Sequence, residues 1–136
     1  MTAEAAAGRD IEEIARLDAH IPRARLEACI RNGFVYVLRD GAAPVAGVLR
    51  YSLFWQTIPF LEHLYIDAAY RGRGFGRGMM AYWEGAMRQK GYAHVMLSTQ
   101  ADETAQFFYE KLGYRRTGSF LPPGQEALEL MYVKKL

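Results

Sequence analysis

Glycine alternates with other residues in the segment YRGRGFGRGMM, which covers residues 70–80 and precedes an amphipathic pattern. In order, it contains Arg71, Gly72, Arg73, Gly74, Phe75, Gly76, Arg77 and Gly78. The first N–H groups of a helix lack partners and attract anions. Glycine lets backbone approach a phosphate, and arginine adds charge-assisted hydrogen bonds to its oxygens. The segment therefore predicts a phosphate site, with a flexible turn of solvated arginines as the alternative.

Two common phosphate motifs fit this segment poorly. A P-loop requires Gly-Lys-Ser/Thr after its glycines, and none follows here. Residues 76–81, GRGMMA, match the loose dinucleotide pattern G-x-G-x-x-A, and Asp102 follows at about the right distance. The dinucleotide fold is built from successive βαβ units, whereas strands with hairpin spacing precede these glycines. A nicotinamide enzyme is therefore the weaker interpretation.

Hydrophobic periodicity predicts the elements that position the glycine segment. We expect strands over 34–40, 45–55, 59–67, 94–100 and 127–135, with another over 114–120. We expect helices over 10–21, 23–33, 75–90 and 102–113. A turn over 41–44 joins the first two strands into a hairpin, and the strand over 59–67 is apolar on both faces, as a central strand is.

The start of the chain gives weaker signals. Asp10 and Glu13 have the spacing of a capping box at the first helix. Any strand before Asp10 would be short. The order of the elements predicts an α+β fold with a mixed, mostly antiparallel central sheet and helices on both faces.

Composition limits the classes of function. The 136 residues fit one domain, 1–136, with enough apolar residues for a core. The net charge of +2 gives no support to nucleic-acid binding. One cysteine excludes an internal disulfide and multi-cysteine zinc sites, so we expect no metal. No apolar run would span a membrane, and the start lacks the pattern of a signal peptide, which favours the cytoplasm.

Two blocks of the sequence resemble the GNAT N-acetyltransferase superfamily. In RGRGFG, Arg71, Gly74 and Gly76 match the family motif R/Q-x-x-G-x-G/A, between a strand and a helix. In DETAQFFYEKLGY, four residues match N-x-x-A-x-x-x-Y-x-x-x-G-F/Y, namely Ala105, Tyr109, Gly113 and Tyr114. Asp102 stands where the family usually has asparagine. The motifs cover about 60–136, and LEHLYID is similar to the family's central strand.

The resemblance implies acetyl-coenzyme A as the acetyl donor. Its pyrophosphate would lie on the backbone N–H groups of 72–77. Its pantetheine arm would run along Leu64, Tyr65 and Ile66 and pair with their backbone as an extra strand does. The family's central sheet is splayed between two strands, and the thioester enters that gap. A backbone N–H near 64–66 would polarise the thioester carbonyl.

Acetyl transfer requires a neutral amine and a proton for the departing thiolate. A free alkylammonium has a pKa near 10.4, so a base must accept its proton. Glu62, in the otherwise apolar strand over 59–67, is the nearest ionisable candidate for this base. The alternative is that its carboxylate only forms a salt bridge or faces the edge of the sheet. His63 would point to the opposite face by strand alternation. Tyr109 matches the family tyrosine that protonates the thiolate. The alternative is that the Tyr109 ring only packs in the core and has no role in catalysis.

The acceptor is less clearly indicated. Asp102 is expected at the N-cap of its helix, where aspartate in place of the family asparagine removes a hydrogen-bond donor toward the pantetheine and adds a charge. Three aromatic residues, Phe54, Trp55 and Phe60, would line an acceptor pocket or belong to the core. Arg23 and Arg25 would meet an anionic substrate or be solvated. A small-molecule, peptide or protein amine fits equally, as does a monomer or a homodimer.

Two further functions remain open beside an N-acetyltransferase that works by direct attack. A catalytically silent module could bind acyl-coenzyme A as a sensor, an interpretation that Asp102 favours slightly. A nicotinamide enzyme is the third. Glu62 and Tyr109 favour chemistry over sensing.

Overall fold

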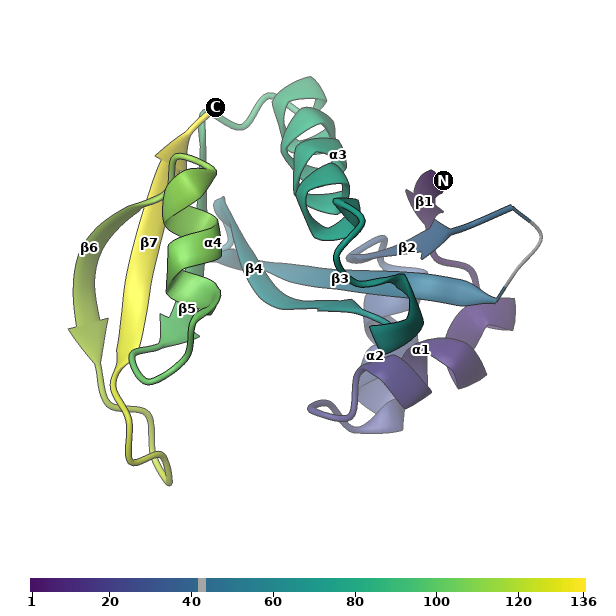
Figure 1. The fold of residues 1–136 in the computed structure, drawn as a ribbon, viewed down its shortest axis with the longest axis horizontal. Coiled ribbons are helices and arrows are strands. Elements are labelled where there is room, and N and C mark those ends of the chain that lie inside the picture. Colours follow the sequence, from purple (N-terminus) through teal and green to yellow (C-terminus); the bar gives the residue numbers. More distant parts are fainter. Residues whose placement is uncertain (42–43) are drawn as a thin grey trace.

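The strands of the computed structural model, which describes residues 1–41 and 44–136, form one seven-stranded sheet (Figure 1). Its order is β1-β2-β3-β4-β5-β7-β6, and every neighbouring pair is antiparallel except β4–β5. The strands are β1 (Thr2–Ala5), β2 (Val35–Arg39), β3 (Val45–Phe54), β4 (Ile58–Ile66), β5 (His94–Gln100), β6 (Arg115–Phe120) and β7 (Glu129–Lys135). The predicted mixed, mostly antiparallel sheet with a central β4 is confirmed.

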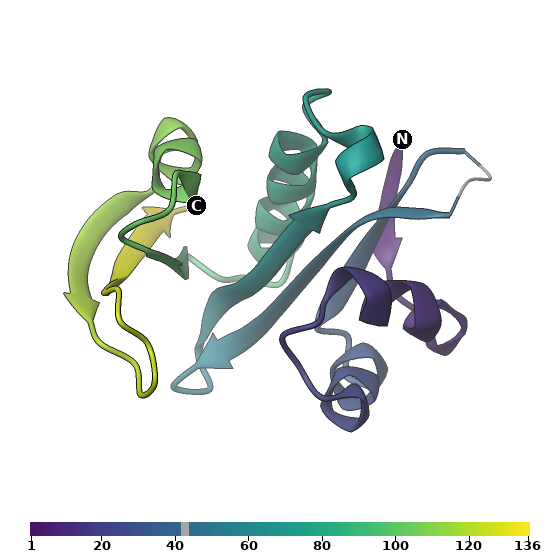
Figure 2. The ribbon, with the colours of Figure 1, turned by 60° about the horizontal axis from the view of Figure 1, so that its bottom comes forward.

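Helices cover both faces of the sheet, as predicted. They are α1 (Ile11–Leu17), α2 (Arg23–Arg31), α3 (Phe75–Gln89) and α4 (Ala105–Lys111), with short 3₁₀ turns η1 (Gly8–Asp10) and η2 (Ala68–Tyr70). Figures 1 and 2 show α3 and α4 on one face and α1 and α2 on the other. Alternating residues of β2 and β3 divide the core accordingly, because successive side chains of a strand point to opposite faces.

Each half of the core has its own apolar cluster. Tyr36 and Leu38 pack with Met79, Trp83 and other residues on the α3 side. Val35 and Val37 of the same strand pack with residues of α1 and α2. The apolar stripe predicted for 75–90 is therefore the face that α3 buries, and it holds the N-terminal end of this helix beside the end of β4.

Three details differ from expectation or go beyond it. The capping box is wrong: the Asp10 carboxylate accepts from Ala7 N–H, and Glu13 accepts from Val45 N–H instead. A four-residue β1 exists and pairs with β2 at the sheet edge. The predicted turn over 41–44 includes residues 42 and 43, which lie outside the described residues, although β2 and β3 do pair as a hairpin.

Candidate active site

The parallel strands β4 and β5 touch only briefly and then diverge (Figure 1). Their pairing is limited to Phe60↔Met96 and Leu61↔Leu97, although β4 continues to Ile66 and β5 to Gln100. The edge of β4 over 64–66 that faces away from β3 therefore has no partner strand among the described residues. The predicted splay between two central strands is confirmed.

The glycine segment turns the chain from β4 into α3. Gly72 and Gly74 have φ values of 75° and 79°, in the left-handed region where a side chain is strained. Gly74 is the N-cap of α3, no side chain caps this end, and the first helical bond runs from Gly78 N–H to Gly74 C=O. The N–H groups of residues 75–77 therefore stand at an uncapped helix end, as an anion site requires.

A cavity of about 560 Å³, here named the helix-end cavity, opens at this end of α3. Its lining includes Arg71, Gly74, Gly76, Arg77, Phe108 and Lys111. Among the described lining residues three are cationic and none is acidic, so the cavity favours an anion. Lys111 comes from α4 and was not identified from the sequence.

Arg73 is the one predicted arginine that the structure turns elsewhere. Its guanidinium lies over the rings of Tyr70 and Phe75, 5.8 and 5.0 Å from their centroids. Its Nη2 is 3.9 Å from an oxygen of Asp40. Arg73 does not line the helix-end cavity, so any effect on a phosphate there acts over a longer distance.

Arg71 links the helix-end cavity to the free strand edge. Its Nε donates to the carbonyl of Ile66 at 3.0 Å, and its guanidinium lies 5.0 Å from the centre of the Tyr65 ring. Arg71 also lines a second cavity of about 830 Å³, here named the strand-edge cavity. That cavity is further lined by Leu64, Tyr65, Ile66, Asp102, Phe108 and Tyr109.

Tyr109 lies where the strand-edge cavity meets a third cavity between β4 and β5. The residue is 8% exposed, and its hydroxyl has no hydrogen-bond partner among the described residues. Burial, and to a smaller degree the charge of Glu103, raise the pKa of Tyr109 to about 12. The phenol is therefore protonated at neutral pH and open to a ligand.

Asp102 is not the N-cap that the sequence predicted. Helix α4 begins at Ala105 after Thr104, and no side chain caps it. Gln106 instead donates from Nε2 to the carbonyls of Ala101 and Glu103 and holds the preceding loop. Asp102 is exposed and lines the strand-edge cavity.

The third cavity, of about 500 Å³, is named the carboxylate cavity and is lined by Glu62, His63, Thr99, Glu103, Tyr109 and Glu129, among others. It holds both Glu62 and His63, so the prediction that they face opposite sides is wrong. The reason is a β-bulge: Arg50 pairs with His63 and Tyr51 with Leu61, which leaves Glu62 as the extra residue. A bulge interrupts the alternation on which that prediction relied.

A buried arginine holds the Glu62 carboxylate. Arg50 donates from Nη1 to Glu62 Oε1 and from Nε to Asp18 Oδ2, both at 2.7 Å. Arg50 and Asp18 are buried, whereas the Glu62 side chain is 36% exposed. The salt-bridged state that was the alternative for Glu62 is therefore present, and the same carboxylate still lines the cavity.

His63 has a structural hydrogen bond as well as a place in the cavity wall. Its Nε2 lies 3.1 Å from the carbonyl oxygen of Leu17 and 3.7 Å from Asp18 Oδ1. Burial lowers its pKa below the ordinary 6.5, because desolvation disfavours the charged imidazole. The ring is therefore neutral at physiological pH.

Only one of the predicted acceptor residues reaches the carboxylate cavity. Phe60 lines it, whereas Phe54 packs against Trp55, which is 79% exposed at the β3–β4 turn. Arg23 is exposed and paired with Glu12 and Glu27, and Arg25 is exposed. Neither arginine lines the carboxylate cavity, so the structure does not support their contact with an anionic substrate.

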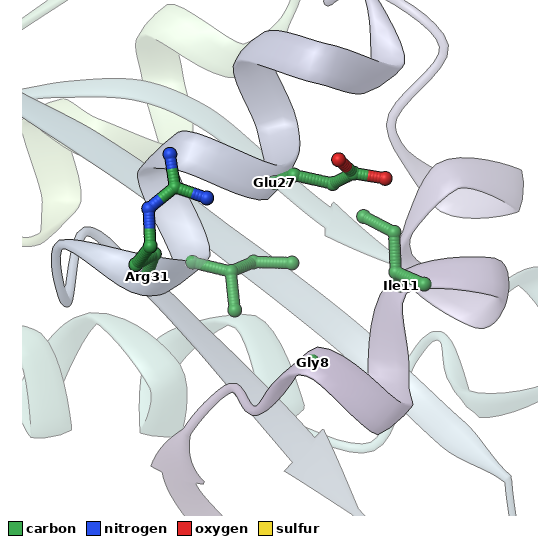
Figure 3. Close-up of a pocket in the computed structure, with 5 residues that line it drawn as sticks. Gly8, Ile11, Glu27 and Arg31 are labelled. Carbon is green, nitrogen blue, oxygen red and sulfur yellow. The ribbon is translucent and has the colours of Figure 1, made fainter.

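A separate cavity of about 430 Å³ lies between η1, α1 and α2 (Figure 3). Its lining residues are Gly8, Ile11, Glu27, Ile30 and Arg31, and none belongs to the predicted site. Within 1–41 and 44–136, no group of three or more His, Cys, Asp or Glu side chains is arranged to hold a metal ion. No helix in the described part of the chain is long and apolar enough to cross a membrane.

Solved structures share this architecture. Ard1 from Thermoplasma volcanium superposes with a TM-score of 0.86 at 21% identity, over 99% of this chain and 97% of that one. The ribosomal-protein-alanine N-acetyltransferase of Brucella melitensis gives 0.83 at 18% identity over 100% of both chains. A structure of the NatC complex bound to Gag peptide and CoA gives 0.84 at 15% identity, over 99% and 98%.

The family assignment comes from the sequence itself. The model of the acetyltransferase (GNAT) family matches residues 5–114, which include the glycine segment, the bulged strand and Tyr109. No curated protein matches the chain in sequence. The resemblance read from two short motifs, and the acetyltransferase class that it implied, are thereby confirmed. The chain belongs to the GNAT acetyltransferase family.

Proposed function

We propose that this protein transfers an acetyl group from acetyl-coenzyme A to a primary amine by direct attack. The observation that carries the proposal is the position of Tyr109. Its unpartnered hydroxyl stands between a cavity fitted to the donor and a cavity lined by carboxylates, at the point where β4 and β5 separate.

The donor side fits coenzyme A in three respects. The uncapped end of α3, with Arg71, Arg77 and Lys111, matches a pyrophosphate in charge. The free edge over 64–66 matches the amide groups of a pantetheine arm. The strand-edge cavity, of about 830 Å³, joins the two and leads to Tyr109. Relatives in the fold include the NatC structure bound to CoA.

Bound acetyl-coenzyme A supplies an acetyl group activated as a thioester. In our proposal Glu62 accepts the proton of the acceptor ammonium, directly or through a water, which leaves the nitrogen lone pair free to form the new amide bond. Arg50 orients the Glu62 carboxylate through Oε1. A backbone N–H of 64–66 polarises the carbonyl, and Tyr109 donates its phenolic proton to the sulfur as the carbon–sulfur bond breaks. The second proton of the attacking nitrogen then restores the phenol, so that one proton in all is released through Glu62.

The test is release of free coenzyme A thiol from acetyl-coenzyme A in the presence of an amine panel, with the acetylated amine identified by mass spectrometry. We expect thiol release that depends on the amine, with one acetylated amine formed for each thiol. Binding of acetyl-coenzyme A without turnover of any amine would contradict the proposal and identify a binding module.

A further inference from the structure

The carboxylate cavity differs from the helix-end cavity in its charge. Glu62 comes from β4, Glu103 from the loop before α4, and Glu129 from the start of β7. Among the described residues that line it, none is a lysine or an arginine. Arg50 behind Glu62 also bonds Asp18, so one guanidinium faces two carboxylates there.

Glu103 and Glu129 are the two carboxylates of this cavity that have no cationic partner among the described residues, whereas Glu62 is paired with Arg50. Asp10, Asp18, Asp67 and Glu84 each bond an arginine or a lysine. Within the described residues Glu103 and Glu129 form no ion pair; Glu129 accepts only from the neutral Gln125 amide. Two carboxylates without counter-charges in one cavity create a negative potential that a cationic ligand would relieve.

A neutral residue points to a ligand independently of the charges. Thr99 is 7% exposed and lines the cavity, yet its hydroxyl has no hydrogen-bond partner among the described residues. The hydroxyl of Tyr109 is unpartnered in the same way. Neither hydroxyl is a fully buried atom, since Trp83 Nε1 is the one buried side-chain polar atom without a partner among the described residues. Both hydroxyls are therefore open to the cavity, where a polar ligand can bond them.

The size and shape of the cavity favour a small molecule. Its volume of about 500 Å³ lies in the range of small-ligand pockets. His20, after α1, Phe120, at the end of β6, and Pro122, just beyond it, line the cavity together with residues of β4 and β5. Aromatic and apolar groups thus share the cavity wall with carboxylates, which suits a flexible alkyl chain with charged ends.

We propose that the acceptor is an aliphatic diamine or polyamine, whose second ammonium group is bound by Glu103 and Glu129 while the first faces Glu62 and Tyr109. This inference rests on the proposed acetyl transfer for the role of the first amine. It assigns substrate selection to Glu103 and Glu129, of which Glu103 also contributes to the raised pKa of Tyr109.

The experiment compares acceptors of matched length that differ at the far end: cadaverine, pentylamine and δ-aminovalerate. We expect kcat/KM for cadaverine to exceed that for pentylamine by about tenfold or more, with δ-aminovalerate slowest. The preference should fall as salt is added, because exposed charges are screened. Equal rates for cadaverine and pentylamine, or a faster reaction with δ-aminovalerate or a neutral peptide N-terminus, would overturn the inference.

Variants assign the effect to the two carboxylates. Glu103→Gln and Glu129→Gln should each lower the ratio of cadaverine to pentylamine kcat/KM by about fivefold to tenfold. Glu126→Gln, an exposed glutamate in the connection that precedes β7, should leave the ratio unchanged. A ratio unaffected by all three variants would contradict the assignment.

Binding separates this inference from the proposed function. Cadaverine should bind the coenzyme A-loaded protein in calorimetry, and the double variant of Glu103 and Glu129 should lose that binding. If no amine is turned over but cadaverine still binds through these carboxylates, acetyl transfer fails and the diamine site stands. If monoamines are acetylated and cadaverine gains nothing, acetyl transfer stands and the diamine site fails.

Discussion

The helix-end cavity and the carboxylate cavity, which the strand-edge cavity connects, have opposite charges and are built from different parts of the chain. The helix-end cavity carries three cations and an uncapped helix end, and most of its lining lies within residues 66–77. The carboxylate cavity has acidic side chains and takes its lining from strands, loops and a helix between His20 and Glu129. One side is shaped by local backbone conformation, the other by side chains gathered from the whole fold.

This difference explains why one side leaves a motif and the other does not. The positive φ values at residues 72 and 74 favour glycine, so this backbone conformation can be recognised from the sequence. Carboxylates can reach one cavity from many positions in the chain, so no fixed sequence spacing predicts which of them lie together. We therefore expect the donor side to be sensitive to glycine substitution and the acceptor side to charge.

The largest effect is expected from the buried ion pair behind the acceptor side. Arg50→Met leaves Asp18, which is buried, without its cation, and breaking such a pair costs roughly 3–5 kcal/mol of the free energy of unfolding. Arg25→Met removes an exposed arginine and should cost little. Urea unfolding measures both. Equal stability of the two variants would show that the Arg50–Asp18 pair does not hold this wall together.

Catalysis on the acceptor side should depend on the Glu62 carboxylate. Glu62→Gln keeps the shape but removes the base, so turnover should fall by roughly a hundredfold and the acidic limb of the pH–rate profile should flatten. The matched control is Glu12→Gln, because Glu12 is also bonded to one arginine but lies far from the gap. An unchanged pH–rate profile for Glu62→Gln would show that water or His63, and not Glu62, accepts the proton of the amine.

The donor side should respond to a side chain at Gly74. A Cβ there meets nothing within 4 Å, and the same holds for Gly33, whose φ of 80° matches the 79° of Gly74. Valine at either position therefore brings the same backbone strain, but only Gly74→Val projects toward the helix-end cavity. We expect its affinity for acetyl-coenzyme A to fall about tenfold or more in calorimetry. Equal affinities of the two variants would remove the pyrophosphate from this loop.

The smallest effect concerns the pH dependence of stability. Burial lowers the pKa of His63, so below the ordinary value of 6.5 the unfolded state binds the proton more readily than the folded state. Stability should then decline as the pH falls from about 7.5 to about 5.5, and His63→Gln should weaken that decline. The exposed His94 provides the control. Identical declines in wild type and His63→Gln would show that another group titrates.

Much of the fold could be predicted because it follows local rules. The apolar stripe of residues 75–90 and the double-sided apolarity of β4 gave the right elements and a central strand. The glycine and tyrosine motifs indicated the family correctly. The missed cap at Asp102 shows the limit of local rules: Gln106 holds that loop by bonds to two carbonyls, and no spacing predicts that choice.

The acceptor side escaped prediction because its geometry depends on one inserted residue. The bulge at Glu62 reverses the alternation of β4 and brings His63 to the same cavity. Arg50 and Asp18 are far apart in sequence, and no pattern marks them as partners. On the donor side, long-range contacts decide which cations line the helix-end cavity: aromatic rings and Asp40 hold Arg73 elsewhere, whereas α4 brings Lys111, which no motif marks, to the cavity.

Tyr109→Phe tests the central claim most directly, because it removes one oxygen from the point where the two sides meet and keeps the ring. The hydroxyl has no protein partner among the described residues, so its loss should leave the melting temperature nearly unchanged. Loss of the proton donor should lower kcat by about a hundredfold, with binding of acetyl-coenzyme A intact. Wild-type turnover together with a lowered melting temperature would contradict the account.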